Sequence, residues 1–373
     1  MNPWMSQASP RYFSLNNSLR ERFLMSSEHI IGCILGTAVG DALGLPYENL
    51  SRRRGRVLFG EPDRFHFLGN RGMVSDDTEH TCMVAQALLT SCADPDKFAR
   101  QLAWRLRWWL LSIPTGLGWA TLIAVLKLWF GVSPKNSGYC SAGNGPAMRS
   151  AILGASIDDL DRLRELVRIN SRITHTDPKA EFGAAAVALA AWCARQPKMT
   201  SKEYAQLLRS FLNSNNTEEF LNLVQQVISS VEAGDSANDF LRSQGLKRVS
   251  GYVYHTVPVA LHIGMRHPQD IRAALTEAVK CGGDTDTVAA IVGGIIGTTV
   301  GKVGIPEEWL SRLWEWPRTV TWMESLGQSL AETRKSGQPC PCPRLTALGL
   351  IGRNVLFFLL LWWHVFRRCL PPL

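Results

Sequence analysis

The sequence lacks several features that would assign it to a class at once. Residues 1–22 contain no apolar stretch of the kind found in secretory signal peptides, so we expect a cytoplasmic protein. Basic and aromatic residues do not interleave as they do in nucleic-acid-binding modules, although the formal net charge is +8. The nine cysteines are odd in number and spread through apolar segments, which favours reduced thiols over a disulfide framework. Cys340 and Cys342 have no second Cys/His pair with zinc-like spacing nearby.

Patterns of alternating polar and apolar residues, which would indicate β-strands, are also scarce. With 46% hydrophobic and 19% charged residues the chain is globular, and almost every segment has the period of an α-helix. We therefore predict an all-α, multi-helix domain over residues 27–330, preceded by a flexible extension over residues 1–26. Only Leu58 to Phe67 has the composition of a short strand. We expect a monomer.

The C-terminal segment differs from this domain. Residues 331–344 are polar and contain Pro and Cys, which predicts a linker before an apolar helix, so we treat residues 331–373 as a separate unit. Leu345–Phe366 has roughly the length that spans a membrane, but Arg353 and Asn354 interrupt it. Two interpretations stay open: a helix in or on a membrane, or a helix docked on a partner or on the domain itself.

Acidic residues occur at the predicted N-termini of two apolar helices. Asp284, Asp286 and Thr287 follow two glycines and precede a run without a polar face, and Ser75, Asp76 and Asp77 open an earlier helix. Helix capping alone accounts for either set. Two buried acidic helix ends in one domain are better explained by hard cations, and carboxylate and hydroxyl oxygens suit Mg²⁺ or Mn²⁺. This requires that His80 and Cys281, which lie near the two sets in sequence, point away.

Five ordered motifs together resemble the ADP-ribosylglycohydrolase family. They are Gly-Asp-Ala-Leu-Gly at 40–44 with Glu48, Ser-Asp-Asp-Thr at 75–78, Gly-Asn-Gly-Pro-Ala-Met-Arg at 143–149, Thr-His-Thr-Asp at 174–177 and Gly-Gly-Asp-Thr-Asp-Thr at 282–287. The resemblance covers roughly residues 27–320. It implies an orthogonally packed all-α fold, two Mg²⁺ or Mn²⁺ ions and the removal of ADP-ribose from a modified side chain or a related conjugate.

The resemblance also assigns expected roles to single residues. The metal ligands would be Ser75, Asp76, Asp77, Asp284, Asp286 and Thr287, and the catalytic residues Glu48, Asp77 and Asp286, with Glu48 as an acid or base. The substrate would contact Ser141, Gly143, Asn144, Gly145 and His175. The Gly-Asn-Gly segment precedes a helix, so its backbone N–H groups could bind the diphosphate. The loop Thr115–Gly118 falls where family members line the substrate entrance.

Three functions remain open at this point. The first is a metal-dependent hydrolase that removes ADP-ribose from a protein side chain, with arginine favoured. The second is hydrolysis of another conjugate: ADP-ribosyl-serine, O-acetyl-ADP-ribose or ADP-ribosylated nucleic acid. The third is a family member that binds ADP-ribose without turning it over. The partners would be the ADP-ribosylated substrate and, through Leu345–Phe366, a membrane or another protein.

Overall fold

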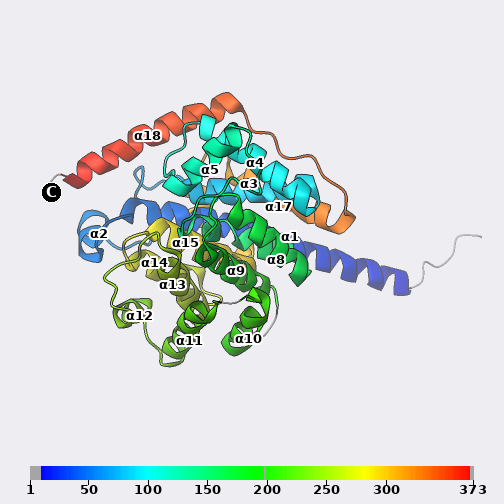
Figure 1. Cartoon of the computed structure of the whole chain (residues 1–373), viewed down its shortest axis with the longest axis horizontal. Coiled ribbons are helices and arrows are strands. Elements are labelled where there is room, and N and C mark those ends of the chain that lie inside the picture. Colours follow the sequence, from blue (N-terminus) through cyan, green and yellow to red (C-terminus); the bar gives the residue numbers. More distant parts are fainter. Residues whose placement is uncertain (1–9, 197–198, 215, 370–373) are drawn as a thin grey trace, which may run out of the picture.

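The computed structural model describes residues 10–196, 199–214 and 216–369, with side chains from residue 27 onward. Within these residues the secondary structure is helical, and the β-bridges are isolated pairs that form no sheet. The predicted all-α fold class is confirmed. Figure 1 shows α1 crossing the middle of the molecule, with the remaining helices stacked around its second half. Residues 10–26 of the expected N-terminal extension belong to α1, and residues 1–9 lie outside the described residues.

The helices divide between the two halves of the chain. The first half contains α1 (Pro10–Gly44), α2 (Arg52–Phe59), α3 (Asp76–Ser91), α4 (Pro95–Leu111), α5 (Trp119–Trp129), α6 (Gly145–Met148), α7 (Ala151–Ser156), α8 (Leu160–Arg172) and α9 (Pro178–Cys193). The second half contains α10 (Ser201–Leu212), α11 (Glu218–Glu232), α12 (Ala237–Ser243), α13 (Val253–Arg266), α14 (Ile271–Lys280), α15 (Thr285–Val300), α16 (Glu307–Arg312), α17 (Val320–Ser336) and α18 (Ala347–Cys369). Two short 3₁₀ helices, η1 (Leu45–Tyr47) and η2 (Lys302–Gly304), follow α1 and α15.

The centre of the domain is the close pair α1 and α15. A glycine stripe on α1 faces small residues of α15, and a Cβ atom on Gly36 would lie 2.1 Å from the carbonyl oxygen of Gly293. A Cβ atom on Gly293 would in turn lie 2.0 Å from the carbonyl oxygen of Gly36. The two backbones therefore touch, which only glycine permits at these positions. The spacing of four residues along α1 serves helix packing, and it aligns the C-terminal end of α1 with the N-terminal end of α15.

Helix starts follow local capping chemistry. Ser75 at the start of α3 accepts a hydrogen bond from the backbone N–H of Asp77, and Asp94 at the start of α4 accepts one from Lys97. Asp177 caps α9 in the same way through the N–H of Lys179. These caps fix where each helix begins and hence which side chains lie at its N-terminus.

The strand expected at Leu58 to Phe67 is wrong. Ser51 instead caps the short helix α2 by accepting a hydrogen bond from the N–H of Arg54. The rest of the segment is loop, in which Phe65 and Phe67 are buried. Their apolar side chains fill the core without strand pairing, so composition alone suggested the wrong structure.

The apolar C-terminal helix α18 lies along the outside of the domain, at the upper edge of Figure 1. Among the described residues, two helical segments are long and apolar enough to cross a membrane: residues 27–47, whose most apolar stretch is buried, and residues 347–368, whose most apolar stretch is only 28% buried. Arg353, Asn354, Phe357 and His364 make up much of the buried side of α18. This spacing of three and four residues defines one helical face, so α18 docks on the domain through that face.

Candidate active site

Two glycines with a left-handed backbone precede the N-terminus of α15. Gly282 and Gly283 have φ angles of 69° and 86°, in the left-handed region. A Cβ atom on Gly283 would lie 1.9 Å from the carbonyl oxygen of Val249. This close approach turns the chain so that Asp284 stands at the N-cap, and Asp286 follows inside the first turn, almost completely buried. The positive end of the α15 dipole therefore faces two carboxylates.

The N-terminus of α3 presents a second set of oxygens beside the first. The hydroxyl of Ser75 donates to Oδ2 of Asp77 over 3.1 Å. The hydroxyl of Thr287, on α15, donates to the same Oδ2 atom over 3.3 Å. The two acidic motifs, about 200 residues apart in the chain, thus meet at Asp77.

A carboxylate that the sequence argument did not select supports this meeting point. Asp41 is completely buried in α1 and accepts hydrogen bonds from the N–H groups of Ser75 (2.9 Å) and Thr78 (3.1 Å) and from the Thr78 hydroxyl (2.5 Å). It therefore caps α3 from another helix. Burial raises the pKa of Asp41 to about 6. The signal for Asp41 was an acid inside an otherwise apolar, glycine-rich helix.

Negative charge accumulates where these helix ends meet. Burial, and then the neighbouring carboxylates, raise the pKa values of Asp76, Asp77 and Asp286 well above their ordinary value. The pKa of Asp284 is raised by burial as well, and the hydrogen bond from Asn144 opposes that rise. Such a cluster must either take up protons or bind cations.

The Gly-Asn-Gly loop and His175 form the facing side. Asn144 donates from Nδ2 to Oδ2 of Asp284 over 2.6 Å, and Ser141 accepts at its hydroxyl from the N–H of Gly143. Cβ atoms on Gly143 and Gly145 would lie 3.1 and 2.9 Å from atoms of the His175 ring. The loop thus lies flat on the imidazole. Burial and the charge of Arg149 lower the pKa of His175 to about 3, so its ring is neutral.

Glu48 stands just after η1, between the acidic motifs and α18. Burial, and then the charge of Asp284, raise its pKa above the ordinary value. Arg368, near the C-terminal end of α18, donates hydrogen bonds to the carbonyl oxygens of Leu45, Pro46 and Glu48. The end of the tail helix therefore holds the segment that carries Glu48.

The acidic motifs, the Gly-Asn-Gly loop and Glu48 line one cleft with a cavity volume of about 350 Å³. Every site residue predicted from the sequence contributes to its wall: Glu48, Ser75, Asp76, Asp77, Ser141, Gly143, Asn144, Gly145, His175, Asp284, Asp286 and Thr287. Thr115, Gly116 and Gly118 of the expected entrance loop line it as well. A ligand of moderate size fits a cleft of this volume.

The cleft also has an apolar wall that sequence reasoning missed. Trp119 of α5 and Phe357 and Leu361 of α18 line it together with the carboxylates. The two tail residues belong to a run that resembles a membrane segment, so composition alone gave no sign of a site. Their helical spacing of four residues was the available signal.

The two groups that could have supplied softer ligands lie elsewhere. Nδ1 of His80 is 3.0 Å from a guanidinium nitrogen of Arg149, and its ring packs edge-on against Trp109. The Cys281 thiol is buried and donates to the carbonyl oxygen of Glu277. Neither side chain lines the cleft. The atoms near the helix ends that face the cleft and could bind a metal ion are therefore oxygens.

These oxygens fit a hard divalent cation in their chemistry. Oδ1 of Asp77 and Oδ1 of Asp286 are both buried and, among the described residues, have no hydrogen-bond partner. In the same part of the chain no three carboxylate, imidazole or thiol groups form a tight preformed cluster. The candidate set fits only if hydroxyl oxygens such as those of Ser75 and Thr287 take part, together with water.

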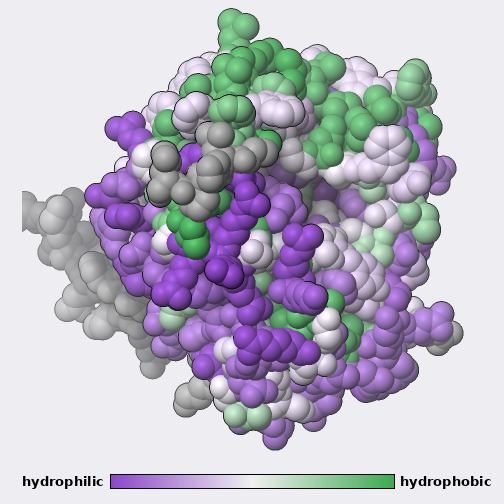
Figure 2. All heavy atoms as spheres, turned by 90° about the vertical axis from the view of Figure 1, so that its left-hand side faces the viewer, coloured by the Kyte–Doolittle hydropathy of each residue, from purple (hydrophilic) through white to green (hydrophobic). Residues whose placement is uncertain are grey.

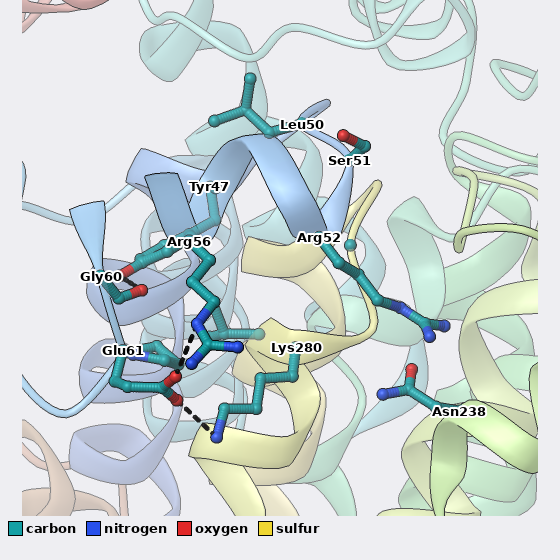
Figure 3. Close-up of a pocket in the computed structure, with 13 residues that line it drawn as sticks. Tyr47, Leu50, Ser51, Arg52, Arg56, Gly60, Glu61, Asn238 and Lys280 are labelled. Atoms are coloured by element: carbon teal, nitrogen blue, oxygen red, sulfur yellow. Dashed lines mark hydrogen bonds and ion pairs between the residues drawn. The ribbon is translucent and has the colours of Figure 1, made fainter. Parts of the chain in front are cut away.

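A second hollow near Gly282 lacks this chemistry. It has a volume of about 260 Å³, and Figure 3 shows Glu61 between Arg56 and Lys280 on its wall. Glu61 pairs with Arg56 over 3.4 Å and with Lys280 over 2.6 Å. Its single carboxylate is thus committed to two cations, and the cleft of the acidic motifs remains the candidate active site.

Known proteins resemble the chain over most of its length. The family model described as ADP-ribosylglycohydrolase matches residues 24–339. The ADP-ribosylhydrolase ARH3 of Mus musculus is 25% identical over 332 residues, covering 74% of this chain and 85% of the relative. The ADP-ribosyl-[dinitrogen reductase] glycohydrolase of Rhodospirillum rubrum is 27% identical over 298 residues, covering 77% and 90%.

A solved structure agrees with these relatives. The chain matches an ADP-ribosylglycohydrolase-related protein complex with a TM-score of 0.60 and 25% identity, over 83% of this chain and 99% of that one. The chain belongs to the ADP-ribosylglycohydrolase family and is a glycosidase that acts on ADP-ribose linkages.

Proposed function

We propose that this enzyme removes ADP-ribose from a modified protein side chain, with arginine favoured, and that it depends on two Mg²⁺ or Mn²⁺ ions. The observation that carries the metal dependence is the pair of buried, unpartnered oxygens, Oδ1 of Asp77 and Oδ1 of Asp286, at two converging helix ends of the described chain. An unpaired buried carboxylate is costly, and a divalent cation removes that cost. The arginine preference rests on the likeness to the reductase-activating glycohydrolases.

Six residues would hold the ions: Ser75, Asp76, Asp77, Asp284, Asp286 and Thr287. Bound there, the ions would supply positive charge for the hydroxyls of the substrate ribose and for a nearby water molecule. Asn144 fixes the rotamer of Asp284 through its 2.6 Å hydrogen bond, and the Ser75 hydroxyl does the same for Asp77. The site is therefore organised by hydrogen bonds before the substrate arrives.

The chain's own residues bind the rest of the substrate. The backbone N–H group of Gly145 can donate to the diphosphate, whereas that of Gly143 is bonded to the Ser141 hydroxyl, and no side chain on either glycine blocks the approach. The neutral ring of His175 lies directly behind this loop and adds no charge that would hold the product back. The apolar side chains of Trp119, Phe357 and Leu361 line the other side of the cleft.

Glu48 is placed to move the proton. Its carboxyl lines the cleft, and burial beside Asp284 raises its pKa, which favours a group that takes up a proton and releases it again. As a base it would take the proton of the attacking water, and as an acid it would give a proton to the leaving nitrogen. Asn49 donates from Nδ2 to Oε1 of Glu48 over 2.9 Å and leaves Oε2 available for that transfer.

The test combines removal of metal with removal of one ligand. The purified chain is incubated separately with ADP-ribosyl-arginine and ADP-ribosyl-serine peptides in Mg²⁺, in Mn²⁺ and after treatment with EDTA, and release of ADP-ribose is measured. We expect EDTA to abolish release, and Asp286→Asn to reduce it at least about a hundredfold even with saturating metal. Full activity after EDTA and dialysis would refute the metal dependence, and release only from ADP-ribosyl-serine peptide would refute the arginine preference.

Substitution of Asn49 provides a control. Asn49 is exposed and, apart from its hydrogen bond to Glu48, lies outside the cleft wall. Asn49→Gly, which keeps the left-handed backbone of this position (φ 61°), should leave metal affinity unchanged in calorimetric titration with Mn²⁺, whereas Asp286→Asn should weaken that affinity. Equal metal affinity in the two variants would place the metal site elsewhere.

A further inference from the structure

The outer face of α18 carries a continuous apolar surface. Large side chains along this face are 45–85% exposed, among them Leu348, Phe358, Leu359, Trp362, Trp363 and Phe366. The helix contains no acidic residue. Figure 2 shows hydrophobic residues gathered along the upper edge of the molecule, the edge along which α18 runs in Figure 1, whereas the surface below is mostly hydrophilic. An exposed apolar surface of this extent marks an interaction site.

The opposite face of α18 is fixed to the domain by polar contacts. Arg353 pairs with Glu315 over 2.7 Å, and Asn354 donates from Nδ2 to the carbonyl oxygen of Ser112 over 2.8 Å. The ring of His364 contacts the carbonyl oxygen of Phe67. If α18 crossed a bilayer, these groups would lose their partners and Arg353 would enter hydrocarbon. The helix therefore stays docked on the domain and exposes its outer face to solvent.

Cationic residues surround one end of that face. Arg54, Arg64 and Arg367 are all exposed. Arg54 hydrogen-bonds to the backbone of Arg368, and Arg64 and Arg367 line a hollow together with Trp363. Tryptophan beside arginine is the combination that favours the headgroup region of a bilayer, where the indole meets the apolar boundary and the guanidinium meets phosphate.

We propose that the outer face of α18, together with these three arginines, binds peripherally to the surface of an anionic lipid bilayer. The apolar side chains enter the boundary between headgroups and acyl chains, and the arginines contact lipid phosphates. A second copy of the chain fits this surface less well, because α18 has no acidic residue to meet Arg367 across a shared interface.

The experiment measures cosedimentation of the full-length purified chain with vesicles. We expect binding to vesicles that contain phosphatidylglycerol, weak binding to pure phosphatidylcholine vesicles, and loss of binding as salt concentration rises. Trp362→Glu and Trp363→Glu should each weaken binding roughly tenfold, and Arg367→Gln about fivefold. Binding to both kinds of vesicle with equal affinity at all salt concentrations would overturn the role of the arginines.

A matched variant and two further measurements separate the remaining explanations. Val303→Glu changes an 89% exposed apolar residue of η2, away from α18, and should not change vesicle binding. All variants should keep their release of ADP-ribose from a soluble substrate, which shows that the domain is folded. The proposal is overturned if the chain does not bind vesicles and forms dimers that Trp363→Glu dissociates. It is equally overturned if the native membrane-bound chain resists alkaline carbonate and requires detergent, as a spanning helix would.

Discussion

The docking of α18 depends on a buried ion pair, and its removal gives a measurable prediction. Arg353 and Glu315 lie 2.7 Å apart with side chains 4% and 0% exposed. Glu315 also accepts at Oε2 from the N–H of Val74, and Arg353 donates to the carbonyl oxygen of the same residue. Val74 directly precedes Ser75, so the pair connects α18 to the start of α3.

Arg353→Met would leave the Glu315 carboxylate buried with the N–H of Val74 as its remaining hydrogen-bond donor. Breaking a buried ion pair from one side costs about 3–5 kcal/mol, because the remaining charge has lost its compensation. Undocking α18 would return Glu315 to water, so this cost favours opening of the helix. At 1.36 kcal/mol for each factor of ten, the opening equilibrium should rise roughly 10²- to 10⁴-fold.

Hydrogen–deuterium exchange of the α18 amides measures this opening. Amides over residues 350–364 should exchange faster in Arg353→Met by that factor, and those in the α1–α15 pair should be unchanged. The matched control is the double variant Arg353→Met with Glu315→Gln, which leaves no unpaired charge and should regain most of the protection. If the double variant exchanges as fast as the single one, or the single variant exchanges like the native chain, the ion pair does not hold α18.

Two further predictions concern the stability of the domain. Burial lowers the pKa of His262 to about 4, so below pH 6.5 the unfolded state binds more protons than the folded state. The contribution of neutral His262 to the free energy of unfolding, at most about 3 kcal/mol, is present above pH 6.5 and is lost as pH falls towards 4. Chemical unfolding of native chain and His262→Gln over that range should show a smaller loss in the variant, and identical pH profiles would contradict the assignment. Gly36→Ala should lower the free energy of unfolding by at least about 1–3 kcal/mol, because its Cβ atom would meet the backbone of Gly293. Gly352→Ala, whose Cβ atom would meet no other atom, should be neutral or stabilising. Equal effects of the two substitutions would contradict the backbone contact.

Sequence reasoning reached the site because its parts have local signals. A serine before two acids predicts a capped helix, and Gly282 and Gly283 before Asp284 predict a turn that presents the next residue. The cost of burying two acidic helix ends then related the ends to each other through a shared cation, the family pattern added the substrate, and in the structure the ends meet at Oδ2 of Asp77. Local rules placed each helix end, but the meeting itself is a property of the packing of α1 against α15.

The residues that were missed depend on partners distant in sequence. Asp41 is 34 residues from Ser75, whose N–H it caps, and no local pattern gives that pairing. Asn354 interrupts an apolar run when only the sequence is considered, and its partner Ser112 is 242 residues away. In the structure the polar residues of the tail are its docking contacts. A polar residue inside an apolar helix therefore predicts a buried partner, but it does not say which one.

The acidic motifs of the cleft and the helix α18, which forms part of its wall, lie in different parts of the chain. The family model ends at residue 339, and α18 begins at Ala347, so the helix lies outside the part of the chain that the family pattern describes. Phe357 and Leu361 nevertheless line the cleft, and Arg368 holds the segment that carries Glu48. The acidic motifs therefore lie inside the part of the chain that the family model matches, whereas part of the entrance wall lies outside it. Since the shape of the wall beside the motifs decides which groups can enter, we expect the choice of leaving group to depend on α18 as well as on the motifs.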